Sequence, residues 1–236
     1  AAKLCSCHWR SVTKAPDLRI RGIHWFHSKL AKRGVFEGQA LKRVHYVPPS
    51  QYLSDELQRE VKHEYVGGVT YAMSGARVQH NRIAVEIVSL LSSQLRGKKC
   101  EVFNSDMKVR IQLPSHSRFY YPDALVVCDS NAPDDSFQDR PVVVVEVLSH
   151  GTRRLDQGEK KDAYLTIPSL KTYLLIEQDQ PLVTAYQRGE QGFEATVYAG
   201  QDGIVPLPDI GCELKLAEIY RRIDFGAEPD DQDGVP

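Results

Sequence analysis

The stretch Val142-Val143-Val144-Val145-Glu146-Val147-Leu148 decides the fold class of this chain. Apolar residues occupy nearly every position, so we expect a strand buried on both faces, which is typical of the centre of a sheet covered by helices. Glu146 is the exception, because it carries a carboxylate into this strand. An unpaired buried carboxylate costs several kcal/mol, so we expect Glu146 to pair with a cationic side chain or to bind a metal cation.

A second apolar strand is predicted just upstream, over residues 121–128. Its third residue, Asp123, follows a proline at the point where a loop becomes a strand. Because neighbouring strands lie about 4.8 Å apart, Asp123 and Glu146 could share one divalent ion. Taken alone, Asp123 is equally well explained as a turn residue.

The segment after the Glu146 strand predicts a helix over residues 156–167. Asp156, Lys160 and Tyr164 are spaced four residues apart, so they lie along one face of this helix, which can overhang the carboxylates. A lysine there can stabilise charge that develops on a phosphate. Purely structural roles are the alternative. Glu146 can form a salt bridge with Lys160, Asp156 can cap the helix, and Tyr164 can belong to the core.

Hydrophobic periodicity predicts the other elements. Helical spacing is found over residues 50–62, 78–96 and 214–223. Strand spacing is found over residues 107–113, 171–177, 181–187 and 193–198. Gly67-Gly68 between two β-prone runs predicts a hairpin, and residues 131–140 predict a polar loop. This order of elements indicates an α/β fold with a sheet flanked by helices.

Length and composition are those of an ordinary globular protein, with 236 residues of which 42% are hydrophobic and 26% charged. We assign residues 46–223 to one domain, 1–45 to a basic N-terminal extension and 224–236 to an acidic C-terminal tail. The extension carries ten Lys/Arg against two acids, so it could contact phosphates, although a solvated tail explains it more simply. No apolar run reaches the length of a membrane-spanning helix, so we expect no membrane partner.

Cysteine usage favours a reducing, cytoplasmic location. Five cysteines are an odd number and show no paired framework, so we expect unpaired thiols. The cluster Cys5-Ser6-Cys7-His8 lacks the second ligand pair that a structural zinc site needs.

Three motifs resemble a known family when their order and spacing are taken together: Pro122-Asp123, Val145-Glu146-Val147-Leu148-Ser149, and Asp156-Gln157-Gly158-Glu159-Lys160 with Tyr164. They resemble the Uma-two family of restriction-endonuclease-like proteins, in the PD-(D/E)XK nuclease superfamily. The resemblance covers about residues 46–222. It implies a restriction-endonuclease-like mixed β-sheet flanked by α-helices, magnesium-dependent hydrolysis of phosphodiester bonds, and DNA as the substrate.

The resemblance also implies roles for individual residues. Asp123 and Glu146 would hold Mg²⁺, with the backbone carbonyl of Val147 as a third ligand, and Mn²⁺ should substitute. The superfamily usually carries a lysine two residues after the glutamate, but Leu148 stands there. The matching lysine is then Lys160 on the next helix, or Lys161 if that helix is rotated.

Four more residues are candidates for the site. Glu64 resembles the family's glutamate and could complete the acidic cluster. His80 could contact a phosphate or support a ligand, although a lone histidine near a helix start is more often a surface residue. Arg153 and Arg154 could hold the DNA backbone.

We therefore expect a metal-dependent endonuclease that cuts DNA, with Lys160 assisting the attacking water. The alternative is a nuclease-fold protein that binds nucleic acid, or assembles, without cutting. Residues 46–236 carry twenty Lys/Arg against twenty-nine acids, a balance that weakens nonspecific DNA binding. A homodimer with two basic arms would offset this deficit and would allow both strands to be cut.

Overall fold

The valine-rich stretch forms strand β8 (Pro141–Val147), and six of its seven residues are buried. β8 lies inside a six-stranded sheet of order β11-β10-β9-β8-β6-β3, parallel to β9 (Thr172–Ile176) and antiparallel to β6 (Ala124–Val127). The prediction of a central strand is confirmed. The other strands of this sheet are β3 (Glu101–Asn104), β10 (Leu182–Gly189) and β11 (Gly192–Ala199).

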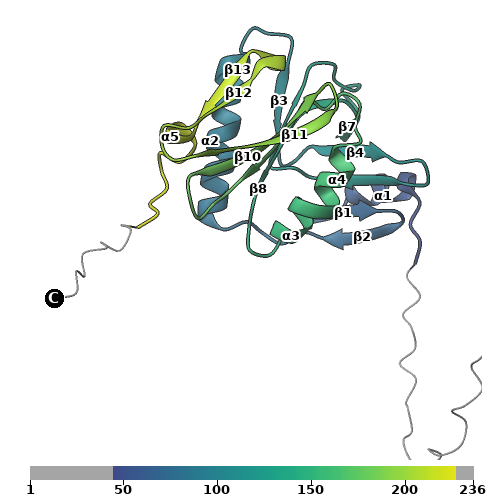
Figure 1. Cartoon of the computed structure of the whole chain (residues 1–236). Coiled ribbons are helices and arrows are strands. Elements are labelled where there is room, and N and C mark those ends of the chain that lie inside the picture. The colour runs from purple at the N-terminus through teal and green to yellow at the C-terminus, as the bar shows by residue number, and fades with distance from the viewer. Residues whose placement is uncertain (1–44, 227–236) are drawn as a thin grey trace, which may run out of the picture. The chain divides into compact units, whose positions relative to one another are not determined.

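This structure is a computed structural model, and it describes residues 45–226 (Figure 1). All of the domain predicted over residues 46–223 is described, while its boundaries stay a prediction. The basic extension and the acidic tail lie outside the described residues, apart from a few positions at their inner ends. The Cys5-Ser6-Cys7-His8 cluster lies outside them as well.

A second sheet has five strands in the order β2-β1-β5-β4-β7. These strands are β1 (His63–Val66), β2 (Val69–Ala72), β4 (Lys108–Gln112), β5 (Ser117–Tyr120) and β7 (Phe137–Gln138). The hairpin of β1 and β2 is confirmed, and it turns at Gly67 and Gly68, whose φ angles of 55° and 103° favour glycine. Strands β5 and β7 were not predicted, and the short β7 lies inside the predicted polar loop over residues 131–140.

The chain passes from the smaller sheet to the larger one at Pro122. β5 ends before it, and β6 begins after it at Ala124. Proline has no N–H to donate to a ladder, so pairing is interrupted here. The strand predicted over residues 121–128 is therefore shorter than expected, and Asp123 occupies the junction between the two sheets.

Both faces of the larger sheet are covered (Figure 1). Helix α2 (Val78–Leu95) packs Ile83, Ile87 and Leu91 against one face, as its spacing predicted. The smaller sheet and the helical segment after β8 pack against the other face. The structure thus has the predicted α/β fold. Within residues 45–226, no helix combines the length and apolar character that a membrane span needs.

Two predicted helices are wrong at their ends. The helix predicted over residues 50–62 is α1 (Pro49–Glu56), and it stops where the Glu56 carboxylate accepts the backbone N–H of His63 at 2.6 Å. In the helix predicted over residues 214–223, only α5 (Leu216–Ile219) is helical. The preceding residues form β13 (Cys212–Lys215), paired with β12 (Ile204–Leu207). Their side chains alternate between buried and exposed, as expected for a strand with one face on the core.

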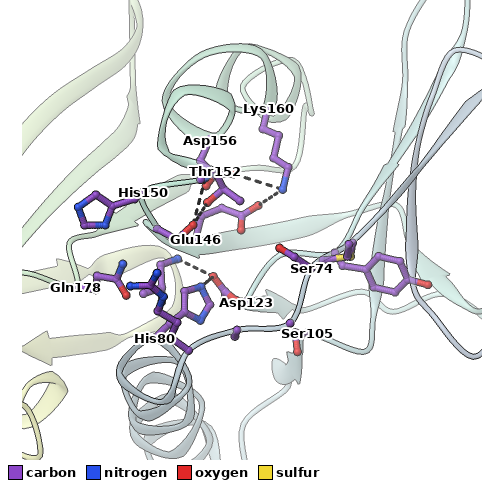
Figure 2. A pocket seen from close by; sticks show the side chains of 18 of the residues that line it. Ser74, His80, Ser105, Asp123, Glu146, His150, Thr152, Asp156, Lys160 and Gln178 are labelled. Carbon is purple, nitrogen blue, oxygen red and sulfur yellow. Dashed lines mark hydrogen bonds and ion pairs between the residues drawn. The ribbon is translucent and has the colours of Figure 1, made fainter.

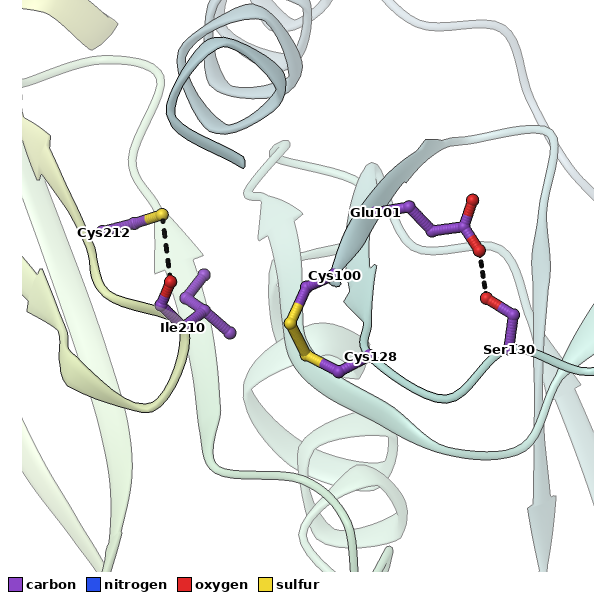
Figure 3. The surroundings of a disulfide bond; sticks show 6 residues. All are labelled: Cys100, Glu101, Cys128, Ser130, Ile210 and Cys212. Atoms are coloured by element: carbon purple, nitrogen blue, oxygen red, sulfur yellow. Dashed lines mark hydrogen bonds between the residues drawn. A yellow bond between two sulfur atoms is a disulfide. The ribbon is translucent and has the colours of Figure 1, made fainter. Parts of the chain in front are cut away.

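Cys100 and Cys128 are joined by a disulfide between the start of β3 and the end of β6 (Figure 3). The prediction of unpaired cysteines is therefore wrong. The two residues are 28 positions apart in sequence, and the ladder in which Glu101 faces Val127 brings them together. The bond also removes the argument from unpaired thiols for a reducing, cytoplasmic location. Cys212 is free and buried.

Replacing Cys100 and Cys128 together by serine is expected to lower the free energy of unfolding by about 3 kcal/mol, because the cross-link restricts the unfolded chain. Urea denaturation of the wild type with and without a reductant, beside the double variant, measures this. Equal midpoints in all three samples would show that the bond contributes nothing to stability.

Candidate active site

Three of the acidic residues predicted from the sequence, Asp123, Glu146 and Asp156, line one pocket of about 500 Å³ (Figure 2). Glu64 does not line it, but contacts Lys160, which does. Asp123 and Glu146 line it from the adjoining ends of β6 and β8. Asp156 and Lys160 reach it from the helical segment above in Figure 2, and His80 reaches it from the helix below. Three segments that are far apart in sequence therefore converge on one cavity.

Asp123 is held against strand β8 by its own carboxylate. In the β6–β8 ladder Ala124 pairs with Val145, so the next position on each strand brings Asp123 opposite Glu146. One oxygen of Asp123, Oδ2, accepts the backbone N–H of Val147 at 2.7 Å. This hydrogen bond ties the Asp123 side chain to the strand that carries Glu146. The two carboxylates therefore keep a fixed position relative to each other.

Glu146 and Lys160 form the buried centre of the site, each 4% exposed. The Lys160 ammonium, Nζ, lies 3.7 Å from Glu146 Oε1, 2.6 Å from Glu64 Oε1 and 3.3 Å from Asp156 Oδ1. The Tyr164 hydroxyl donates to Glu146 Oε1 at 3.3 Å. The salt bridge between Glu146 and Lys160 is thus present, but the closest partner of Lys160 is Glu64, from strand β1.

The charges in this cluster are unbalanced. Burial raises the pKa of Glu146 well above its ordinary value, and the charges of Asp156, Asp123 and Glu64 raise it further against the opposing effect of Lys160. Burial alone would lower the pKa of Lys160, but the three carboxylates outweigh it and raise that pKa. Three carboxylates therefore surround the Lys160 ammonium, and this acidic cluster favours a further positive charge.

The donor set fits a magnesium ion. Within the described part of the chain, no three acidic, histidine or cysteine side chains already converge in a metal-binding geometry. Mg²⁺ does not need such a cage, since it usually takes one or two carboxylates and completes its shell with waters and substrate phosphates. Asp123 and Glu146 supply two oxygen ligands from adjacent strands, and the excess negative charge is the kind that a divalent cation neutralises.

His80 lies beside the predicted ligands. Its Nε2 is 3.3 Å from Asp123 Oδ2. Burial lowers the pKa of His80, but the hydrogen bond and charge of Asp123 and the backbone carbonyl of Val147 outweigh it, so the pKa is raised. His80 therefore contacts the carboxylate and faces the carbonyl that were predicted to bind the metal.

The helical segment after β8 begins three residues earlier than predicted. It consists of α3 (Arg153–Leu155), a π-helical turn η1 (Asp156–Lys160) and α4 (Lys161–Tyr164). The Tyr173 hydroxyl donates to the carbonyl of Asp156 at 3.0 Å and anchors this turn to β9. π-turns are frequent at functional sites. Lys161 lies near Asp162 and over the Tyr186 ring, so Lys160 is the lysine that faces the carboxylates.

The two arginines that were predicted to contact DNA, Arg153 and Arg154, lie outside the pocket. Both guanidinium nitrogens of Arg153, Nη1 and Nη2, donate to Glu177, whose carboxylate is buried. Arg154 is exposed. Neither residue lines the pocket, so Arg153 would have to leave Glu177 before it could hold a phosphate.

Several pocket residues were not predicted from the sequence. Lys62, Arg77, His150 and Gln178 line the cavity from four separate segments. Each is a polar residue to which the sequence analysis assigned no role in the site. Only the arrangement of the two sheets brings them to the acids.

A mixed sheet with acids at the ends of two adjacent strands, and a lysine on the following helix, defines a restriction-endonuclease-like protein. The chain belongs to the Uma2 family, described as "Putative restriction endonuclease", whose model matches residues 49–217. The predicted family is confirmed.

Two relatives from Synechocystis sp. are uncharacterized proteins. One, slr1290, is 33% identical over 178 residues, covering 75% of this chain and 93% of the relative. The other, sll1609, is 31% identical over 157 residues, covering 65% of this chain and 88% of the relative. A crystal structure described as a putative nuclease belonging to DUF820, from Anabaena variabilis, matches with a TM-score of 0.57 and 20% identity. It covers 72% of this chain and 97% of that one, and it supports the predicted fold.

Proposed function

We propose that this protein is a metal-dependent endonuclease that hydrolyses phosphodiester bonds in DNA. The observation that carries this proposal is the meeting of Asp123 and Glu146 in one pocket beside Lys160. Membership of a family of putative restriction endonucleases supports the reaction class. A homodimer that cuts both strands stays a prediction.

The metal would be held by the carboxylates of Asp123 and Glu146 and by the carbonyl of Val147. When bound, Mg²⁺ supplies Lewis acidity toward a phosphate oxygen and lowers the pKa of a water. The residues of the chain prepare this site: the backbone N–H of Val147 fixes Asp123, and the Tyr164 hydroxyl fixes Glu146.

Lys160 is the proposed catalytic cation. Glu64 and Asp156 hold its ammonium at 2.6 and 3.3 Å and keep it protonated. A charged donor that is already ordered before the substrate arrives can orient the attacking water and stabilise the charge that develops on the phosphate. Glu64 and Asp156 are therefore positioning residues for Lys160.

Cleavage is expected to require a divalent cation. Nicking of supercoiled plasmid should occur with Mg²⁺ or Mn²⁺ and stop with EDTA. Ca²⁺, which prefers more ligands at longer distances, should support DNA binding with little cleavage. Cutting that persists in EDTA would contradict the metal-dependent mechanism. DNA binding without cutting in every metal would favour a nuclease-fold protein that binds nucleic acid without hydrolysing it.

A further inference from the structure

One cation at the mouth of the pocket has no role in the proposed chemistry. Arg77 precedes helix α2, is exposed, and lines the same cavity as Asp123 and Glu146. Glu146 lies deeper, since it is buried within β8, and Asp123 is only partly exposed. Arg77 is therefore placed where a substrate would enter.

The two lysines that line the pocket already have partners within the protein. Lys62 contacts Asp106 and donates to the carbonyl of Ser105 at 3.0 Å, and Lys160 is held by carboxylates. By contrast, no carboxylate within residues 45–226 forms an ion pair with Arg77. Its guanidinium is thus available to an anion from outside the protein.

We infer that Arg77 binds a backbone phosphate of the DNA strand next to the phosphate that is cut. This inference rests on the proposed function and deepens it. A guanidinium suits this task, since it can donate two parallel hydrogen bonds to one phosphate. It also offsets the repulsion that an approaching polyanion meets from the acidic floor of the pocket.

The position of Arg77 along the chain fits a neighbouring phosphate. Arg77 lies three residues before His80, which contacts Asp123 at 3.3 Å. Three residues of an α-helix rise about 4.5 Å. Phosphates of one strand follow each other at about 3.4 Å along the duplex axis, so the long arginine side chain reaches a phosphate one or two nucleotides from the scissile bond.

Arg77 is a better candidate for this contact than Arg153. The Arg153 guanidinium is held by the buried carboxylate of Glu177 and does not line the pocket. Binding a phosphate through Arg153 would break that pair, whereas binding through Arg77 breaks no ion pair with the described residues.

The test compares two arginines of one helix. Arg77 precedes α2, and Arg96 follows its last residue; α2 has 18 residues, so the two are separated by roughly 27 Å. Both are exposed. Arg77→Gln and Arg96→Gln thus remove the same charge from opposite ends of the helix. Binding of the full chain to two unrelated fluorescent duplexes is measured by anisotropy in Ca²⁺ over a series of salt concentrations.

Arg77→Gln should weaken binding about tenfold for both duplexes. It should also make the slope of log affinity against log salt shallower by about one, as expected for the loss of one phosphate contact. Arg96→Gln should change neither quantity, and Arg77→Lys should restore part of the slope. Circular dichroism checks that each variant is folded.

The outcomes separate this inference from the proposed function. An Arg77→Gln variant with wild-type affinity and slope would overturn the inference, even if the wild type cuts DNA. Equal losses in the Arg77 and Arg96 variants would also overturn it, because they would indicate diffuse attraction. A wild type that binds through Arg77 but never cuts would uphold the contact between Arg77 and a phosphate and reject the nuclease. A wild type that binds no DNA would reject both.

Discussion

Asp123→Asn is expected to abolish DNA cleavage, with a loss on the order of 10³-fold in rate. The amide oxygen of asparagine can still accept the N–H of Val147, so the strand junction should be preserved. The substitution removes the negative charge that would bind the metal, and metal assistance contributes several kcal/mol to the transition state. Initial rates of plasmid nicking in Mg²⁺ measure the effect.

Asp129→Asn is the matched control for this variant. Asp129 follows the other end of β6, is 69% exposed and pairs with Arg140. The Asp129→Asn variant should cut DNA at the wild-type rate. Cleavage by Asp123→Asn at a rate close to that of the control would reject Asp123 as a metal ligand.

Lys160→Met is expected to lower kcat by about 10²- to 10³-fold, while DNA binding in Ca²⁺ stays close to that of the wild type. The reason is that the variant loses a preorganised charge that acts on the reacting phosphate. Single-turnover cleavage and anisotropy measure the two quantities separately. Lys161→Met is the control, because Lys161 lies near Asp162 and faces away from the carboxylates. Equal losses in both variants would contradict the proposed role.

Lys160→Met should also show a pH-dependent loss of stability. The pKa of Glu146 is already raised above its ordinary value of 4.5, and removing Lys160 raises it further. A carboxyl whose pKa is higher in the folded than in the unfolded state favours folding when protonated, so the variant should lose stability as pH rises above about 4.5. Lys160→Met should therefore be much less stable than the wild type at pH 8 and closer to it at pH 5. Parallel stability curves would show that Lys160 does not balance these acids.

The arrangement at the centre of the candidate site could be predicted because strand patterns constrain it. The apolar run around Glu146 fixes a buried strand, and side chains at matching positions of adjacent strands share a face. Asp123 and Glu146 therefore had to meet once β6 and β8 paired. The spacing of Asp156 and Lys160 likewise places both on one side of a helix. Glu64 was suggested by resemblance, and its contact with Lys160 depends on a hairpin in the other sheet.

Features that depend on long-range pairing were missed. The Cys100–Cys128 disulfide forms only because β3 pairs with β6, and β3 itself has no clear pattern. Residues 212–215 carry too few apolar positions to distinguish strand from helix without their partner β12. Arg77 is one arginine among many until the two sheets bring it to the pocket.

Anomalous scattering from crystals of the protein soaked in Mn²⁺ tests the central claim most directly. We expect one manganese peak bonded to the carboxylates of Asp123 and Glu146 and to the carbonyl of Val147, and no peak in Asp123→Asn crystals. A manganese ion bound elsewhere, or a peak that persists unchanged in the Asp123→Asn crystals, would contradict the proposed metal site.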